Sequence, residues 1–121
     1  MKNCLIVDDS KMIRRVATRI LKDLNFSTRE SADGRDALGL CRKDMPDAIL
    51  LDWNMPVMDG LSFLKELRAT PGGNSPVVVF CTAERSVERI TEALDAGADE
   101  YVMKPFDSDI IESKFAEVGL L

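Results

Sequence analysis

Short apolar segments alternate with helical patterns along the whole chain, and this alternation constrains the fold more than any other feature. The apolar segments lie at residues 3–8, about 26–31, 47–52, 76–82 and 100–103, and each is followed by apolar residues at helical spacing. Strands that alternate with helices form a mostly parallel sheet covered by helices on both faces, with right-handed crossovers. We therefore predict an α/β fold of five strand–helix units in one domain, residues 1–121.

Several segments carry additional positional signals. The first strand is apolar throughout, which predicts cover on both faces, whereas polar residues alternate in the second, which predicts a place near a sheet edge. Ser10 is suited to cap the first helix, and Gly97 is suited to end the fourth. The predicted buried face of the first helix comprises Ile13, Val16, Ala17, Ile20, Leu21 and Leu24.

Composition excludes several classes of protein. No apolar run approaches the ~20 residues that span a bilayer, and the N-terminus lacks a secretory signal, so we expect a soluble cytoplasmic protein without membrane insertion. The net charge of −5 argues against nucleic-acid binding. The first helix is locally basic, and we interpret its cations as a solvated face: Arg14, Arg15, Arg19 and Lys22.

Cysteine and histidine content narrows the chemistry. The three cysteines, Cys4, Cys41 and Cys81, form no CxxC pair, which is typical of reduced thiols in a hydrophobic core. The chain has no histidine, which removes Ser-His and Cys-His catalysis and most zinc sites. Any chemistry must therefore use carboxylates, hydroxyls and lysine.

Polar residues gather where the predicted strands end. The stretch "AILLDWNMPVMDG" ends a buried strand on Asp52, and an ionised carboxylate there is costly without a compensating partner. Asp8 and Asp9 end the first strand, Thr82 the fourth and Lys104 the fifth. Because ligands of such sheets bind beyond the carboxyl ends of the strands, we predict one site at this edge.

Three carboxylates at one edge repel one another, and a hard divalent cation resolves the conflict. We expect Mg²⁺, with Asp9 and Asp52 as direct ligands, Asp8 acting directly or through water, and the backbone carbonyl of Asn54 as a further ligand. Calcium is the weaker candidate because the spacing lacks an EF-hand loop.

Lys104 and Thr82 complete a site that could accept a phosphoryl group. An ammonium can hold a carboxylate when the site is empty and a phosphoryl oxygen when it is filled, and a hydroxyl offers a further donor. Together with a metal they predict that Asp52 is the nucleophile.

Four stretches, "LIVDDS", "LLDWNMPVMDG", "VVVFCTAE" and "YVMKPF", resemble the receiver domains of two-component response regulators over essentially the whole chain. The resemblance implies a flavodoxin-like, doubly wound (βα)5 fold with strand order 2-1-3-4-5. It also implies that Asp52 takes a phosphoryl group from a sensor histidine kinase or a histidine phosphotransfer protein, that Asp8 and Asp9 hold Mg²⁺, and that Lys104 pairs with the new phosphate.

The resemblance also implies a switch. Thr82, with the backbone of Ala83, would bond the phosphoryl oxygens, Tyr101 would turn inward, and Pro105 would follow a cis bond. A downstream protein would then bind the surface of the fourth helix, fifth strand and fifth helix. The chain would be a signalling protein rather than an enzyme, with self-catalysed, Mg²⁺-dependent phosphorylation and autodephosphorylation.

Asn54 and Glu84 resemble the rate-tuning pair of chemotaxis-type receivers, and the sequence ends soon after the last predicted helix. We therefore expect a stand-alone regulator in chemotaxis or flagellar motor control, without an output domain. A role as intermediate or sink in another phosphorelay is the alternative.

Three rival readings remain. A haloacid-dehalogenase-type phosphatase would carry a second acid two residues after the nucleophile, where Asn54 stands. A flavodoxin would need a hydroxyl- and glycine-rich loop where Asp8 and Asp9 stand. A receiver that serves only as an interaction module would not need the complete set of acids, hydroxyl and lysine.

Overall fold

A five-stranded parallel sheet in the order β2-β1-β3-β4-β5 forms the centre of the computed structural model, which describes residues 1–83 and 86–121. Its strands are β1 (Asn3–Val7), β2 (Ser27–Ser31), β3 (Ala48–Leu51), β4 (Val77–Thr82) and β5 (Glu100–Met103). The helices are α1 (Lys11–Asp23), α2 (Gly34–Lys43), α3 (Gly60–Ala69), α4 (Val87–Asp95) and α5 (Ser108–Glu117). The predicted strand–helix alternation and strand order are confirmed.

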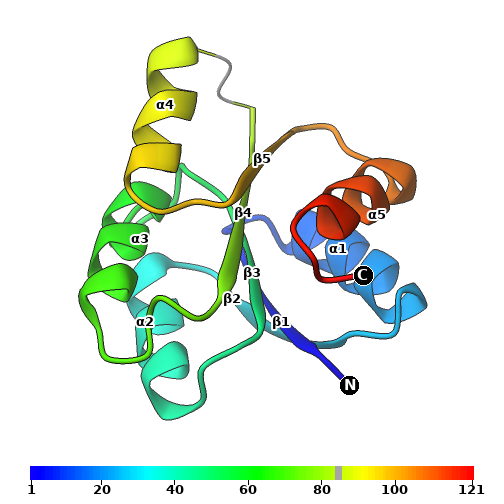
Figure 1. Cartoon of the computed structure of the whole chain (residues 1–121), viewed down its shortest axis with the longest axis horizontal. Helices are drawn as coiled ribbons and strands as arrows, with labels where there is room; N and C mark the ends of the chain where they lie inside the picture. Colours follow the sequence, from blue (N-terminus) through cyan, green and yellow to red (C-terminus); the bar gives the residue numbers. More distant parts are fainter. Residues whose placement is uncertain (84–85) are drawn as a thin grey trace.

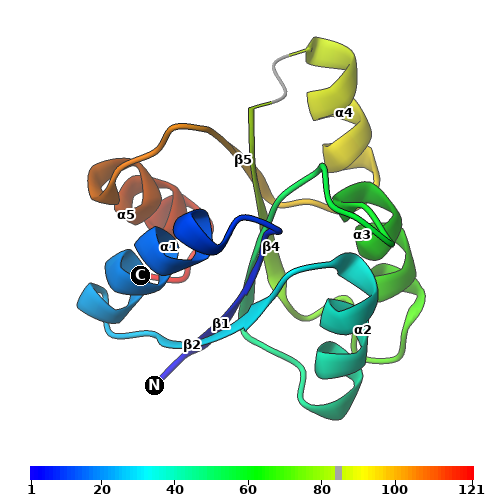
Figure 2. The ribbon, with the colours of Figure 1, turned by 180° about the vertical axis from the view of Figure 1, so that it is seen from behind.

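Two helical layers enclose the sheet. Figure 1 shows α2, α3 and α4 on one face and α1 and α5 on the other, and the view from behind in Figure 2 shows the same division. Successive strand residues point to opposite faces, so Leu5 and Val7 enter one apolar core while Cys4 and Ile6 enter the other. All four are at most 1% exposed, which confirms that β1 is covered on both sides.

Most of the finer sequence expectations are confirmed. Ser10 caps α1 by accepting from the backbone N–H of Ile13, Gly97 follows α4 with a φ of 115°, and β2 lies at a sheet edge. The three cysteines are buried, and burial raises the pKa of Cys4 and Cys81 to about 12. No helix of the described residues is long and apolar enough to cross a membrane.

The predicted buried face of α1 is wrong at one position. Val16 is 43% exposed, whereas Ala17 and Leu21 are buried. One residue turns a helix by about 100°, so a contact line through Ala17 and Leu21 leaves Val16 on the outer side.

Gly60 allows α3 to begin very close to the end of β3. Its backbone N–H donates to the carbonyl of Trp53 at 2.8 Å. A Cβ at this position would lie 2.1 Å from the carbonyl oxygen of Asp52 and 3.0 Å from the ring of Phe80. The backbone at position 60 can therefore approach the backbone of Asp52 this closely only because glycine has no side chain.

Gly60→Ala should lower the free energy of unfolding by about 1–3 kcal/mol, because the added methyl group must displace backbone atoms. Gly39→Ala, within α2, is the matched control, since a Cβ there meets nothing within 4 Å and alanine favours helix by about 1 kcal/mol. Urea unfolding measures both. Equal effects of the two substitutions would contradict the close approach at Gly60.

Candidate functional site

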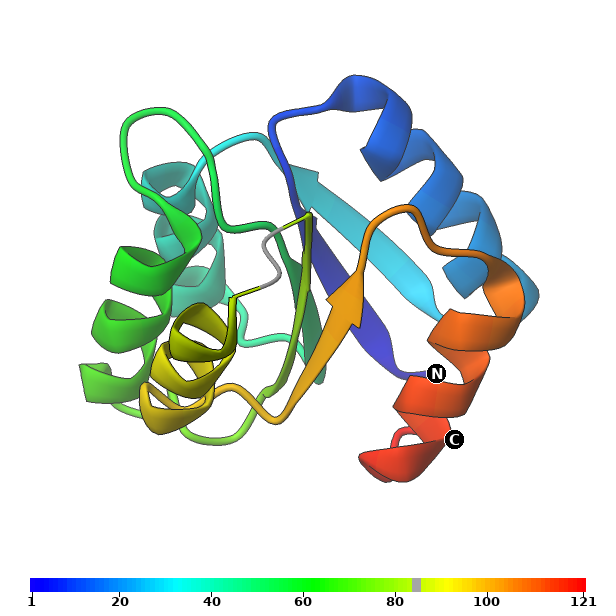
Figure 3. The same cartoon turned by 90° about the horizontal axis from the view of Figure 1, so that it is seen from above.

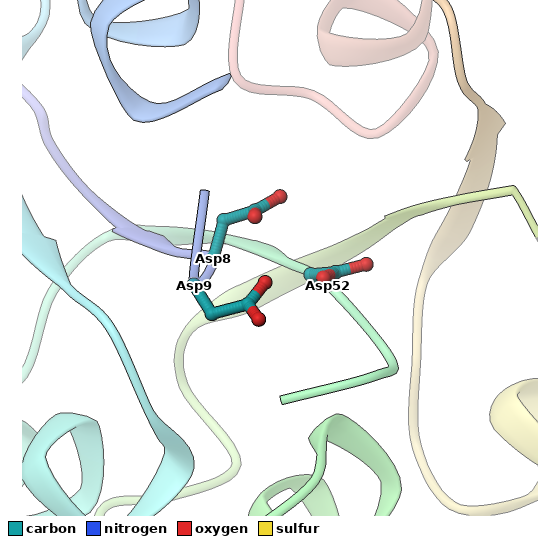
Figure 4. A group of neighbouring side chains, drawn as sticks. All are labelled: Asp8, Asp9 and Asp52. Atoms are coloured by element: carbon teal, nitrogen blue, oxygen red, sulfur yellow. The ribbon is translucent and has the colours of Figure 1, made fainter. Parts of the chain in front are cut away.

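Three carboxylates meet at the carboxyl edge of the sheet. Val7 of β1 is paired with Leu51 of β3, so Asp8 and Asp52 leave neighbouring strands at the same level. Asp8, Asp9 and Asp52 each place a carboxylate oxygen within 4.8 Å of the others, and Figure 4 shows the three side chains beside one another. Asp8 and Asp52 are buried, while Asp9 is exposed.

Lys104 brings a positive charge to this cluster from the end of β5. Its ammonium lies 2.7 Å from Oδ2 of Asp8 and 3.3 Å from Oδ1 of Asp52. Burial acts to lower the pKa of Lys104, but the hydrogen bond to Asp8 and the nearby charge of Asp52 outweigh it, and the pKa is raised. Lys104 therefore remains an ammonium that bridges two buried acids.

The pKa of the Asp52 carboxyl is raised by its surroundings. Burial and then the negative charge of Asp8 raise its pKa from 3.8 to about 6, although Lys104 acts in the opposite direction. Both carboxylate oxygens of Asp8 accept hydrogen bonds: Oδ1 from the backbone N–H of Ser10 at 2.9 Å, and Oδ2 from the ammonium of Lys104. Ionised Asp52 still lacks full compensation, and further positive charge at this edge would stabilise it.

Such a cluster fits a hard divalent cation. Asp8, Asp9 and Asp52 offer carboxylate oxygens, the ligands that Mg²⁺ prefers, and the cluster is open to solvent on the side of Asp9. The described residues therefore contain a donor set suited to the predicted metal.

Most of the other predicted site residues lie on the same edge. Thr82 ends β4 with 1% exposure, and its carbonyl accepts from the backbone N–H of Lys104 at 3.0 Å. Ala83 and Asn54 follow the ends of β4 and β3 and are exposed, and the Lys104–Pro105 bond is cis as predicted. Glu84 lies outside the described residues.

Tyr101 is buried within β5 rather than placed at the edge. Its ring stacks on Phe80 of β4 with a centroid distance of 6.3 Å, and Phe80 lies 5.1 Å from the ring of Trp53, which follows Asp52 directly. An aromatic row thus runs from the acidic cluster to the strand at the far edge of the sheet. This row could not be predicted from the sequence, because its three rings come from segments far apart in the chain: the loop after β3, β4 and β5.

The interpretation of the basic face of α1 is wrong for one residue. Arg14 is not solvated: its guanidinium donates to the carbonyl of Asp8 at 2.7 Å and pairs with Glu30 at 3.0 Å. Arg15, Arg19 and Lys22 are exposed, as expected. Arg14 thus supports the backbone at the acidic cluster, and only the packing of α1 beside β2 reveals it.

Replacing Asp52 should stabilise the metal-free protein at neutral pH. Because folding raises the pKa of this acid, the folded state binds the proton more tightly, and the free energy of unfolding falls as pH rises from about 4 to 7. Asp52→Asn removes this loss, which is at most about 3 kcal/mol. Urea unfolding in EDTA should show a gain at pH 7.5 that shrinks toward pH 4. If the variant were less stable than the wild type at pH 7.5, Lys104 would fully offset the cost of burying the ionised Asp52 carboxylate.

Comparisons with known proteins agree with this fold. A family model described as "Response regulator receiver domain" matches residues 4–116. "Chemotaxis protein CheY-3" of Vibrio cholerae is 39% identical over 115 residues, which cover 94% of this chain and 88% of that protein. "Response regulator MprA" of Mycolicibacterium vanbaalenii is 44% identical over 102 residues, which cover 84% of this chain and 43% of that protein.

A solved structure shows the same architecture. The chemotaxis protein CheY4 of Vibrio cholerae superimposes with a TM-score of 0.92 at 34% identity, and 98% of each chain is covered. The family match, the strand order and the acidic edge lead to one conclusion: the chain belongs to the response regulator receiver domains of two-component signalling.

Proposed function

We propose that Asp52 accepts a phosphoryl group from a phosphohistidine on a histidine kinase or a histidine phosphotransfer protein, and that this modification switches the binding of a downstream protein. One observation carries the proposal: the ammonium of Lys104 lies within ion-pair distance of both Asp8 and Asp52 at the edge of the sheet. An ammonium in this place can pair with a phosphoryl oxygen once Asp52 is modified.

In the proposed step, an ionised carboxylate oxygen of Asp52 attacks phosphorus and forms a P–O bond. The P–N bond breaks, and its electron pair stays on the imidazole nitrogen, which takes a proton from solvent. Lys104 holds one phosphoryl oxygen, and the hydroxyl of Thr82 and the backbone N–H of Ala83 donate to others. These donors follow or end β4 and β5, the two strands next to β3 in the sheet, and Asp52 directly follows β3.

We assign the Mg²⁺ site to Asp8, Asp9, Asp52 and the carbonyl of Asn54. The support is the group of three carboxylates within 4.8 Å of one another and the raised pKa of Asp52. Bound there, Mg²⁺ would supply positive charge to the carboxylates and to the incoming phosphoryl oxygens. Asn54 and Glu84 are proposed to tune the rate at which the phosphoryl group is lost.

We propose that the output surface comprises α4, β5 and α5, with Tyr101 and Pro105 linking it to the site. Exposed apolar side chains on the two helices support this, because Val87 is 75%, Leu94 44% and Ile110 39% exposed. The similarity to two chemotaxis proteins favours a stand-alone cytoplasmic regulator of chemotaxis or of the flagellar motor. The same chemistry would serve another phosphorelay.

Acetyl phosphate with Mg²⁺ should add one phosphoryl group, detected by intact mass, and Asp52→Asn should abolish the adduct. Trp53, the single tryptophan, should change its fluorescence when beryllofluoride and Mg²⁺ are added, because it directly follows Asp52. An unmodified wild-type protein would favour an interaction module. Turnover of small phosphomonoesters would instead favour a phosphatase.

Mg²⁺ should also raise the melting temperature of the wild-type protein, since a ligand at 100 times its Kd stabilises the folded state by about 2.7 kcal/mol. Asp9→Asn should weaken this response, because it removes one proposed ligand from the exposed side of the cluster. Asp23→Asn, at the end of α1, is the matched control. Equal responses in both variants would remove Asp9 from the metal site.

A further inference from the structure

Helix α4 is held to the domain by few side chains. Of its described residues only Ala93 is fully buried, and Ile90 is partly buried against the core of that face. Val87 and Leu94 are exposed. Figure 3 shows α4 at the end of its helical layer, beyond α2 and α3. The attachment of this helix therefore depends strongly on what holds each of its ends.

The C-terminal end of α4 is anchored by hydrogen bonds from Arg68 of α3. This guanidinium donates to the carbonyl of Gly97, two residues after the end of α4, at 2.7 Å from one terminal nitrogen and 3.1 Å from Nε. It also donates at 2.8 Å to the carbonyls of Gly73 and Pro76 and pairs with Asp99 at 3.2 Å. Arg68 is only partly buried, with 14% of its side chain exposed, but its several charge-assisted bonds anchor this end of α4.

The N-terminal half of α4 meets the domain through a weaker contact. The guanidinium carbon of Arg89 lies 5.1 Å from the ring centroid of Trp53, in cation–π geometry. Arg89 is exposed, whereas Trp53 is 2% exposed and directly follows Asp52. The contact thus joins a surface helix to the end of the strand that carries the proposed acceptor.

We propose that the contact between Arg89 and Trp53 holds the first turns of α4 against the domain and can be released, while Arg68 keeps the other end of the helix in place. We call this releasable contact the latch. The proposal rests on the function proposed above, because the releasing event is phosphorylation of Asp52. A phosphoryl group adds about −1.5 to −2 charges beside Trp53 and competes for the guanidinium, since charge-assisted hydrogen bonds are stronger than a cation–π contact. Arg89 is therefore a positioning residue for the output helix.

Hydrogen exchange of the unmodified protein tests the latch without any phosphoryl donor. In Arg89→Gln, amides in the first turns of α4 should exchange about two- to five-fold faster than in the wild type, the change expected for losing an exposed cation–π contact. Glutamine and arginine have similar helix propensity, and the cap that Ser86 forms with the backbone N–H of residue 89 is kept. Glu92→Gln, an exposed change in the same helix, should leave these rates unchanged.

The same measurement with beryllofluoride tests the coupling. In the wild type, beryllofluoride should speed exchange in the first turns of α4 and leave its last turn protected, whereas Arg89→Gln should show a much smaller increment. Unchanged rates in unmodified Arg89→Gln, faster exchange throughout the domain, or an equal beryllofluoride increment would each overturn the latch. If the wild type forms no adduct at Asp52, the proposed function fails, but the first comparison still decides whether Arg89 holds α4.

Discussion

The site at the carboxyl edge of the sheet depends on one ammonium group, which pairs with two buried carboxylates. Lys104 extends from the end of β5, at the sheet edge, past β4 to Asp52 after β3 and Asp8 after β1. Two acids buried side by side without a cation would carry a desolvation cost of several kcal/mol each in addition to their repulsion. The parallel sheet makes the arrangement possible, because all its strands end on the same side.

The site combines rigid support with an unfavourable charge distribution. The residues before Asp8 and Asp52 belong to β1 and β3, two paired strands in the buried part of the sheet, so the two carboxylates have little freedom to separate. The raised pKa of Asp52 shows that the fold compensates this carboxylate incompletely. Destabilisation of this kind is typical of functional sites, where stability is lost to keep reactive groups together.

Two arginines attach α4 by interactions of very different strength. Arg68 donates to three backbone carbonyls and pairs with Asp99, whereas Arg89 rests on the indole of Trp53 while remaining exposed. The stronger attachment lies far from the acidic cluster and the weaker one lies beside it. A helix held in this way responds to charge near Asp52 at one end while the other end stays in place.

The sequence by itself determined three features: the alternation of strands and helices along the chain, the burial of both faces of β1, and the position of four charged residues at one edge of the sheet. These residues are Asp8, Asp9, Asp52 and Lys104. These features follow from local periodicity, and strand ends coincide in any parallel sheet. Only the tertiary structure decided which acids Lys104 pairs with, that Arg14 binds the carbonyl of Asp8, and where Arg68 and Arg89 are anchored. The physical reason is that these contacts join different layers, and their distances depend on how helices pack across the sheet rather than on any repeat along the chain.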